Sequence, residues 1–359
     1  IDLTFIKIFK FYVKTFFVVT FIKIFSANKF KIKDELGMTI YPNFFYKENE
    51  NFYNNKKITP LNFLLTDESH LGHSFFQIIK IYLKLRNNNI LCAEEFVSYI
   101  DIFKGFFNSI SRIVFLKKKK TLFLVDKINF SDFYLDYFYS SFVNRCKLNI
   151  YNFAIPKIVK KYKIKVFHLY LFEYNFGFFL INLVKKFNIH IKGYQHGIFS
   201  SKLFWYDVVL RLNHNKFIPS EIIANNNYSL RKYNILLKKR TKISLIKKQK
   251  SSLLSNLKFK NKSGIKNILL LTGTHDVKDF YIFARENILL NKKNKYFFKL
   301  HPKNKFIFKS EKNLKIINEI KKITFNKIIV SSTSTLVYDF DRTNIPIEIF
   351  RPDYKLECF

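Results

Sequence analysis

The sequence predicts an α/β protein with two Rossmann-like domains that face a cleft, each built on a parallel sheet flanked by helices. Short apolar runs alternate with amphipathic helical segments along most of the chain, which is the pattern of βαβ units. At 359 residues, 48% of them hydrophobic, the chain is long enough for two such domains and can bury a core in each. One polar, basic segment, 238–264, interrupts the alternation. We expect it to link an N-terminal domain (1–237) to a C-terminal domain (265–359).

The first 26 residues form an apolar segment that lysines interrupt. Its longest uncharged run, "TFFVVTFI", is much shorter than the ~20 residues that a membrane span needs. Lys7, Lys10 and Lys14 recur at helical spacing on one face. The segment therefore predicts either a buried helix of the first domain, which we favour, or a helix that lies on an anionic bilayer.

The rest of the N-terminal domain alternates between strand and helix patterns. The predicted helices are "SFFQIIKIYLKL", the long segment 131–162 and "FGFFLINLVKKFN". The predicted strands, each followed by a polar turn, are "NFLLTDES", "NNILCAEEF", "KTLFLVDK", "KVFHLYLFE" and "IHIKGYQHG". A further run, "KFIPSEIIANN", is expected to complete this sheet.

The C-terminal domain has the more regular pattern. Its predicted strands are "KNILLLTGT", "KYFFKLHP", "NKIIV" and "IPIEIF". A helix is expected at "DFYIFARENILL", helical or mixed structure from 303 to 321, and another helix beginning at "STLVYDF". This order of elements indicates a parallel sheet of the Rossmann type.

The formal charge of +37 would ordinarily indicate nucleic acid or an anionic membrane as a partner. However, Lys, Asn, Ile, Phe and Tyr all have AT-rich codons and all are abundant, so codon bias accounts for most of this charge. We find no RNA-recognition signature, paired-cysteine finger or basic heptad helix, and we expect no nucleic-acid partner. A surface this basic still attracts phosphates and acidic lipids.

The cysteines favour a reducing compartment, because they lie far apart with no paired spacing: Cys92, Cys146 and Cys358. This spacing argues against a disulfide framework and a zinc site. Asp67, His70 and His73 superficially resemble metal ligands but have no further ligand set in view, and we expect no metal. The sequence begins with Ile1 and stops soon after a predicted strand, so we expect it to be incomplete at both ends.

Five hydroxyl side chains follow one another at the end of the strand "NKIIV": Ser331, Ser332, Thr333, Ser334 and Thr335. A helix is expected to begin there, and the backbone N–H groups of its first turn lack partners and carry partial positive charge. Hydroxyl groups cap such N–H groups and also bind phosphate oxygens. A single Ser or Thr is enough for a cap, so five in succession favour a phosphate site.

Other polar residues end the neighbouring strands of this domain. His301 can donate a hydrogen bond or a proton to a phosphate leaving group, Pro302 fixes the turn, and Lys299 precedes them. Gly273 and Thr274 close the first strand, where glycine lets the backbone approach a ligand closely. We expect these residues to open onto the same crevice as the hydroxyl run.

In the N-terminal domain two strand ends carry candidate acid–base groups. Glu173 follows "KVFHLYLF" and suits a general base, although a loop-end ion pair is the structural alternative in a protein so rich in lysine. Gln195 and His196 lie between Gly193 and Gly197 at the end of the next strand. We expect His196 to act in catalysis and Gln195 and Gly197 to bind substrate.

Taken in order, "FEYN", "GYQHG", "KLHP" and "SSTSTLVYDF" resemble motifs of bacterial GT-B glycosyltransferases that build surface polysaccharide. The closest resemblance is to the O-antigen or capsule biosynthesis proteins related to sialyltransferases, and it covers roughly 165–350. It implies two Rossmann-like domains around a nucleotide-sugar cleft. It also implies that Glu173 is the base and that His301 and Pro302 bind the donor phosphate. The Ser/Thr motif would hold that phosphate through Ser331, Ser332 and Thr333.

We therefore expect transfer of a sugar, sialic-acid-like, from a nucleotide-activated (CMP-type) donor to a hydroxyl of a surface glycan precursor, without a metal or other cofactor. The acidic-acidic-Gly pattern of sialyltransferases is absent, because Tyr174 and Asn175 follow Glu173. The alternatives are a nucleotide-sugar epimerase of the same fold and a non-catalytic membrane or polysaccharide-assembly protein. The expected location is the cytoplasm, with peripheral contact at the inner face of the membrane, where lipid-linked acceptors reside.

Overall fold

The computed structural model of the chain describes residues 3–26, 32–39, 57–65, 74–88, 90–118, 124–125, 128–129, 142, 145–170, 172–195, 199, 205, 209, 215–225, 227–246, 257–260, 266–273, 276–300, 311–317, 320, 323–332, 334 and 347–351. It divides into two compact units. The first comprises Ile1–Tyr194, Asp207–Ile222 and Arg240–Lys242. The second comprises Gln195–Tyr206, Ile223–Lys239 and Ile243–Phe359.

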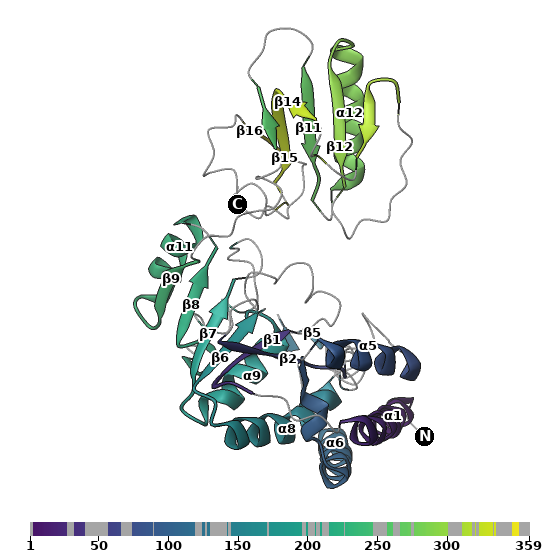
Figure 1. The fold of residues 1–359 in the computed structure, drawn as a ribbon, viewed down its shortest axis with the longest axis vertical. Coiled ribbons are helices and arrows are strands. Elements are labelled where there is room, and N and C mark those ends of the chain that lie inside the picture. The colour runs from purple at the N-terminus through teal and green to yellow at the C-terminus, as the bar shows by residue number, and fades with distance from the viewer. Residues whose placement is uncertain are drawn as a thin grey trace. The chain divides into compact units, whose positions relative to one another are not determined.

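A seven-stranded sheet with the order β3-β2-β1-β6-β7-β8-β9 holds the N-terminal part of the chain together (Figure 1). β1 pairs in parallel with both β2 and β6, as do β2 with β3 and β6 with β7. Its strands are β1 (Glu35–Thr39), β2 (Ile58–Asn62), β3 (Leu91–Cys92), β6 (Val166–Tyr170), β7 (His190–Tyr194), β8 (Glu221–Ala224) and β9 (Lys242–Leu245). The prediction that "KFIPSEIIANN" supplies a strand to this sheet is confirmed.

Several elements differ from the sequence-based expectation. β1 was not predicted, because "ELGMT" begins with a charged residue, contains glycine and lacks the apolar run of a typical buried strand. The strand predicted in "KTLFLVDK" is present as β4 (Leu124–Val125), but it is short and pairs in antiparallel fashion with β5 (Ile128–Asn129) instead of joining the main sheet. The segment expected to link the domains contains β9 and β10 (Lys258–Phe259). The domain boundaries themselves stay a prediction.

Helices cover this sheet: α1 (Leu3–Phe25), α5 (Phe75–Asn87), α6 (Tyr99–Lys118), α8 (Cys146–Tyr162), α9 (Asn175–Lys185) and α11 (Asn227–Leu237), with short 3-10 turns η1 (Ala93–Phe96) and η4 (Asn215–Phe217). α9 packs against β6 and β7, α8 against α9 and α6, and α1 against α5 and α6. A capping box at Ser74 begins α5: the Ser74 hydroxyl accepts the Gln77 N–H, and the Gln77 side chain accepts the Ser74 N–H. α6 was not predicted.

α1 is buried on one side only. Ile8, Phe11 and Val19 are among its buried side chains, whereas Phe9 and Phe17 are more than half exposed. The prediction of a buried helix therefore holds for one face of α1. None of the helices in the described part of the chain has both the length and the hydropathy that crossing a membrane requires.

The second unit contains a five-stranded sheet with the order β13-β12-β11-β15-β16, in which every neighbouring pair is parallel. Its strands are β11 (Asn267–Leu271), β12 (Lys295–Lys299), β13 (Leu314–Ile316), β15 (Lys327–Ser331) and β16 (Ile347–Phe350). α12 (Val277–Leu290) packs on one face through Phe280 and Ala284. Phe325 and Ile320 cover the other face, and β10 pairs with β14 (Thr324–Phe325) beside it. β13 lies where helical or mixed structure was expected.

Parallel pairing in both sheets and the helices packed on them confirm the predicted α/β fold class. In the second unit the four predicted strands β11, β12, β15 and β16 are all present. Residues buried on both faces of a parallel sheet read as continuous apolar runs, which is why β11, β12 and β15 were recognisable.

Candidate functional site at the carboxyl edges of the two sheets

In the five-stranded sheet, the hydroxyl run begins as the last residue of β15. The Ser331 hydroxyl donates a hydrogen bond to Oδ2 of Asp276, and both residues are fully buried. The other carboxylate oxygen, Oδ1, accepts the backbone N–H of Gly273 at 3.1 Å. Asp276 is the residue that precedes α12. One buried carboxylate therefore joins the end of β15, the loop after β11 and the start of α12.

Two further residues of the run, Ser332 and Ser334, form hydrogen bonds through their backbone N–H groups. The Ser332 N–H donates to the Phe350 carbonyl at 2.8 Å, and the Ser334 N–H donates to the Ser331 carbonyl at 2.9 Å. Both serine side chains are buried. Thr333 and Thr335 lie outside the described residues, as does the helix expected to begin there.

At the end of the neighbouring strand, β12, fewer of the predicted residues are described. Lys299 is the last residue of β12, opposite Leu271, and its carbonyl accepts the Thr272 N–H at 3.3 Å. Gly273 is buried beside Asp276. Three residues predicted for this edge lie outside the described residues: Thr274, His301 and Pro302. Binding of phosphate at this edge stays a prediction, and the contact with Asp276 gives Ser331 a structural role in holding the edge together.

At the other sheet, Glu173 lies in the turn between β6 and α9 and is buried. A carboxylate at the carboxyl end of a parallel strand is placed where ligands of open sheets bind. Its predicted role as a base stays a prediction, and the described contacts do not decide between that role and an ion pair.

Gln195 follows β7 and uses both ends of its amide. Its Nε2 donates to the Ser229 hydroxyl at 2.9 Å, and its Oε1 accepts the Asn225 N–H at 3.0 Å. Gln195 thereby joins the ends of β7 and β8 to α11. His196 and Gly197 lie outside the described residues.

Gly193, within β7, has a packing explanation. A Cβ atom there would lie 2.6 Å from Cγ of Pro219 and 2.9 Å from Cδ1 of Phe172, closer than real contacts allow. The first glycine of "GYQHG" is therefore required by the close approach of neighbouring elements and gives no indication of a ligand.

Sequence reasoning missed a buried carboxyl group at the same sheet. Glu94, two residues after β3, accepts three hydrogen bonds on Oε1: the Leu64 N–H at 2.8 Å, the Leu65 N–H at 3.1 Å and the Tyr151 hydroxyl at 2.5 Å. Its Oε2 is buried and has no partner among the described residues. Burial raises the pKa of Glu94 against the lowering effect of these bonds.

A second buried polar group lies at the end of β2. Asn62, the last residue of β2, pairs with Cys92, and neither atom of its side-chain amide has a partner among the described residues. Buried amides and carboxylates normally have partners, and water or a ligand supplies them where the protein does not. This edge can therefore accept a hydrogen bond from a hydroxyl or a water molecule. In sequence, "ILCAEEF" was recognisable only as a strand followed by a polar turn.

A third unpredicted cluster crosses the middle of the sheet. His168 of β6 bonds the Tyr194 hydroxyl through Nδ1 at 2.9 Å and Glu35 through Nε2 at 2.8 Å. Burial lowers the pKa of His168, and the hydrogen bond to Glu35 opposes this. The three residues come from β6, β7 and β1, so their proximity depends on the strand order and could not be read from the sequence.

Among the described residues, no three His, Cys, Asp or Glu side chains gather in a way that could hold a metal ion. No family model matches the sequence, and no curated protein matches it.

Solved structures similar to the chain include the following two. One is a protein assigned as a UDP-N-acetylglucosamine 2-epimerase from Listeria monocytogenes, with 8% identity and a TM-score of 0.40, covering 85% of this chain and 75% of that one. The other is the glycotransferase of kitacinnamycin, with 9% identity and a TM-score of 0.44, covering 90% of this chain and 81% of that one. Similarity at this level does not identify a function.

Proposed function

We propose that the chain is a GT-B glycosyltransferase that moves a sialic-acid-like sugar from a nucleotide-activated donor to a hydroxyl of a surface glycan precursor. The observation that carries the proposal is the chemistry at the carboxyl ends of the parallel strands. Glu173 follows β6 in one sheet; in the other, Ser331 ends β15 and Ser332 follows it. Ligands of open parallel sheets bind at these ends. A carboxylate suits removal of an acceptor proton, and hydroxyls suit a phosphate.

The contact between Ser331 and Asp276 refines the roles proposed for the hydroxyl run. A hydroxyl that donates to a buried carboxylate has no second proton to donate to a phosphate. In this proposal Ser331 and Asp276 position the loop. Phosphate binding then depends on Ser332 and Ser334 and on the residues predicted beside them: Thr333, Thr335, Lys299, His301 and Pro302.

On the acceptor side the proposal assigns the base to Glu173 and a second catalytic role to His196, which follows the next strand, β7. Removing a proton from the acceptor hydroxyl makes its oxygen a better nucleophile at the sugar carbon. At the same time positive and hydrogen-bonding groups stabilise the charge that develops on the departing nucleotide phosphate. The proposal needs no metal, because lysine, histidine and backbone N–H groups can supply that stabilisation.

The test has a binding arm and a turnover arm. Thermal unfolding is measured with CMP, UMP, UDP and CMP-N-acetylneuraminate, and one of them at about 100 times its Kd should add about 2.7 kcal/mol to the stability. With a proven donor and acceptor, a Glu173→Gln variant should keep this shift but transfer the sugar to the acceptor at least about 100-fold more slowly, because general bases contribute 10²–10⁴-fold. Glu286→Gln, a change on α12, is the matched control.

Each result then bears on the proposal. Absence of a shift with every nucleotide would contradict it, as would unchanged turnover in the Glu173→Gln variant. Release of free sugar without any acceptor would instead support the epimerase alternative.

A further inference from the structure

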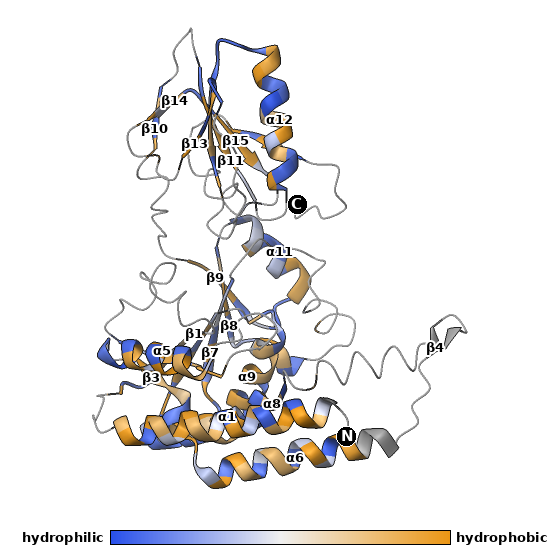
Figure 2. Ribbon diagram, turned by 90° about the vertical axis from the view of Figure 1, so that its right-hand side faces the viewer, coloured by the Kyte–Doolittle hydropathy of each residue, from blue (hydrophilic) through white to orange (hydrophobic). Residues whose placement is uncertain are grey.

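One face of the first unit exposes many large apolar side chains. The large apolar side chains of α1 and α6 that are more than half exposed include Phe9, Phe17, Ile100, Phe103 and Phe107. We call the surface that they form with Val13 the apolar helical face. Figure 2 shows hydrophobic residues repeating along both helices. Soluble proteins rarely expose a continuous apolar surface of this kind without a partner for it.

The buried, the exposed apolar and the basic residues of α1 lie on different sides of the helix. Phe9, Val13 and Phe17 recur every fourth position and point to solvent, while Ile8, Tyr12 and Val19 are buried. Lys10 and Lys14 form a parallel strip one position further on. Going around α1, a buried side is followed by an exposed apolar side and then by a basic side, which is the arrangement of helices that lie in a membrane interface.

Aromatic contacts join α1 to α6 and make the face continuous. Phe106 of α6 packs edge-on against Phe5, Phe9 and Tyr12, with ring centroids 6.4, 6.3 and 5.6 Å away. Further along, Phe16 packs against Tyr99 at 5.2 Å. The two helices therefore present a single rigid surface rather than separate exposed residues.

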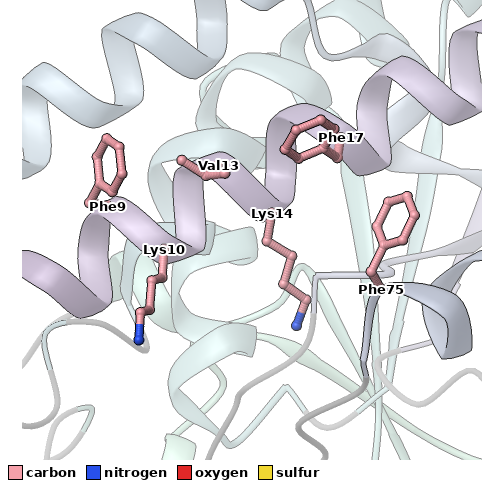
Figure 3. A pocket seen from close by; sticks show the side chains of 6 residues that line it. All are labelled: Phe9, Lys10, Val13, Lys14, Phe17 and Phe75. Atoms are coloured by element: carbon pink, nitrogen blue, oxygen red, sulfur yellow. The ribbon is translucent and has the colours of Figure 1, made fainter.

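A hollow of about 300 Å³ lies between α1 and the start of α5 (Figure 3). Its lining is Phe9, Val13, Phe17 and Phe75, with Lys10 and Lys14. Figure 3 shows both lysines extending to the same side of α1, away from Phe9 and Val13. An apolar wall next to two ammonium groups matches the chemistry of a lipid acyl chain below an anionic phosphate.

The charge of the helices at the apolar helical face indicates which kind of partner fits it. α1 and α5 contain no acidic residue, whereas α1 carries four lysines and α5 two lysines and one arginine. The acidic residue of α6, Asp101, is buried and paired with Lys157. A second copy of the chain would bring one basic face against another, which like-charge repulsion disfavours. A negatively charged surface complements it.

We propose that the apolar helical face docks on an anionic lipid bilayer, with the phosphate of a bilayer phospholipid at Lys10 and Lys14 and its acyl chain in the hollow. Docking places Phe9, Phe17, Phe103 and Phe107 below the headgroups without crossing the bilayer. This inference goes beyond the proposed glycosyl transfer and does not depend on it, because it rests on a different surface.

The experiment is flotation of the full chain with vesicles of phosphatidylcholine alone and of phosphatidylcholine mixed with phosphatidylglycerol. Wild type should float with the mixed vesicles and at least about tenfold less with the neutral ones, because attraction to acidic lipids adds for each nearby lysine. Lys10→Gln with Lys14→Gln should reduce binding to mixed vesicles about tenfold. Phe17→Ser, Phe103→Ser and Phe107→Ser together should reduce it further.

Matched controls distinguish binding through this surface from nonspecific hydrophobic binding and from misfolding. Ile235→Ser, Leu289→Ser and Leu290→Ser replace apolar residues that are equally exposed on α11 and α12, and they should leave binding unchanged. All variants should unfold at the wild-type temperature, since the replaced side chains are exposed. Equal flotation with both vesicle types, no flotation of wild type, or full binding by the triple Phe variant would overturn the proposal. A concentration-dependent dimer abolished by the Phe changes would assign the face to a second copy instead.

Discussion

Glu94 and Asp276 are both buried carboxyl groups that accept a hydrogen bond from a hydroxyl near the end of a parallel strand, yet their surroundings differ. Asp276 uses both oxygens, one for the Gly273 N–H and one for the Ser331 hydroxyl. Glu94 places three bonds on Oε1 and leaves Oε2 without a partner among the described residues. A carboxylate whose two oxygens are both bonded, such as Asp276, therefore links separate elements of the fold. One with a spare oxygen also has a place for a proton or a ligand.

The pKa shifts of the groups around Glu94 agree with this difference. Burial raises the pKa of Glu94, and burial together with the Glu94 charge raises the pKa of Tyr151. Glu95, next in the chain, also has its pKa raised, to about 7, mainly by burial. Carboxyl groups at this edge therefore hold protons at pH values where exposed ones are ionised.

The largest expected effect comes from removing the Glu94 carboxyl group. Glu94→Ala leaves the buried Leu64 N–H without its acceptor, removes the Oε1 bonds of the Leu65 N–H and the Tyr151 hydroxyl, and leaves a cavity, which together should lower the free energy of unfolding by about 3–5 kcal/mol. Glu94→Gln keeps an acceptor for these donors and should cost only about 1 kcal/mol. Urea denaturation of both variants measures the difference. Equal losses for Ala and Gln would mean that the Oε1 bonds do not carry the stability.

A somewhat smaller effect is expected at the other carboxylate. Asp276→Ala removes the carboxylate that accepts the Gly273 N–H and the Ser331 hydroxyl and should cost about 2–3 kcal/mol. Ser331→Ala leaves one carboxylate oxygen unpaired and should cost about 1–2 kcal/mol. The double variant should be less destabilised than the sum of the two by about 1 kcal/mol, because the residues share one bond. Strict additivity in urea denaturation would contradict the structural role given to Ser331.

The most gradual effect is a dependence of stability on pH. Because the folded-state pKa of Glu95 is about 7 and its ordinary value is 4.5, the folded protein binds more protons than the unfolded chain between these values. Its contribution to stability is therefore full below about 4.5 and falls as pH rises to 7, with a slope of at most about 1.4 kcal/mol per pH unit. Glu95→Gln should flatten the stability profile in this window, whereas Asp279→Asn, in the first turn of α12, should leave it unchanged. Identical profiles for Glu95→Gln and wild type would remove this group from the comparison.

The sequence predicted the second unit better than the first. β11, β12 and β15 are apolar runs because neighbours bury them on both faces, and such runs are visible without knowing the partner strands. β1 was missed although it lies between β2 and β6, because "ELGMT" is polar at its first residue and contains glycine. Its place in the sheet depends on pairing with residues far along the chain.

The residues of the candidate sites likewise differ in whether the sequence alone could single them out. The hydroxyl run and Glu173 were found because an unusual residue type follows an apolar run directly. Glu94 and Asp276 were not assigned roles, because each is an ordinary acidic residue in its local sequence. Their importance comes from Tyr151, 57 residues after Glu94, and from Ser331, 55 residues after Asp276.

The sequence by itself determined the α/β class, the strand-ending positions of Glu173 and Ser331, and the lysine spacing of the first helix, since all of these are local patterns. The tertiary structure alone decided which polar groups meet, which oxygen of a carboxylate stays unbonded, and which side of α1 faces solvent. The physical reason is that a hydrogen bond or a buried face requires a partner, and the partner is set by the order of strands and helices in space rather than by neighbours along the chain.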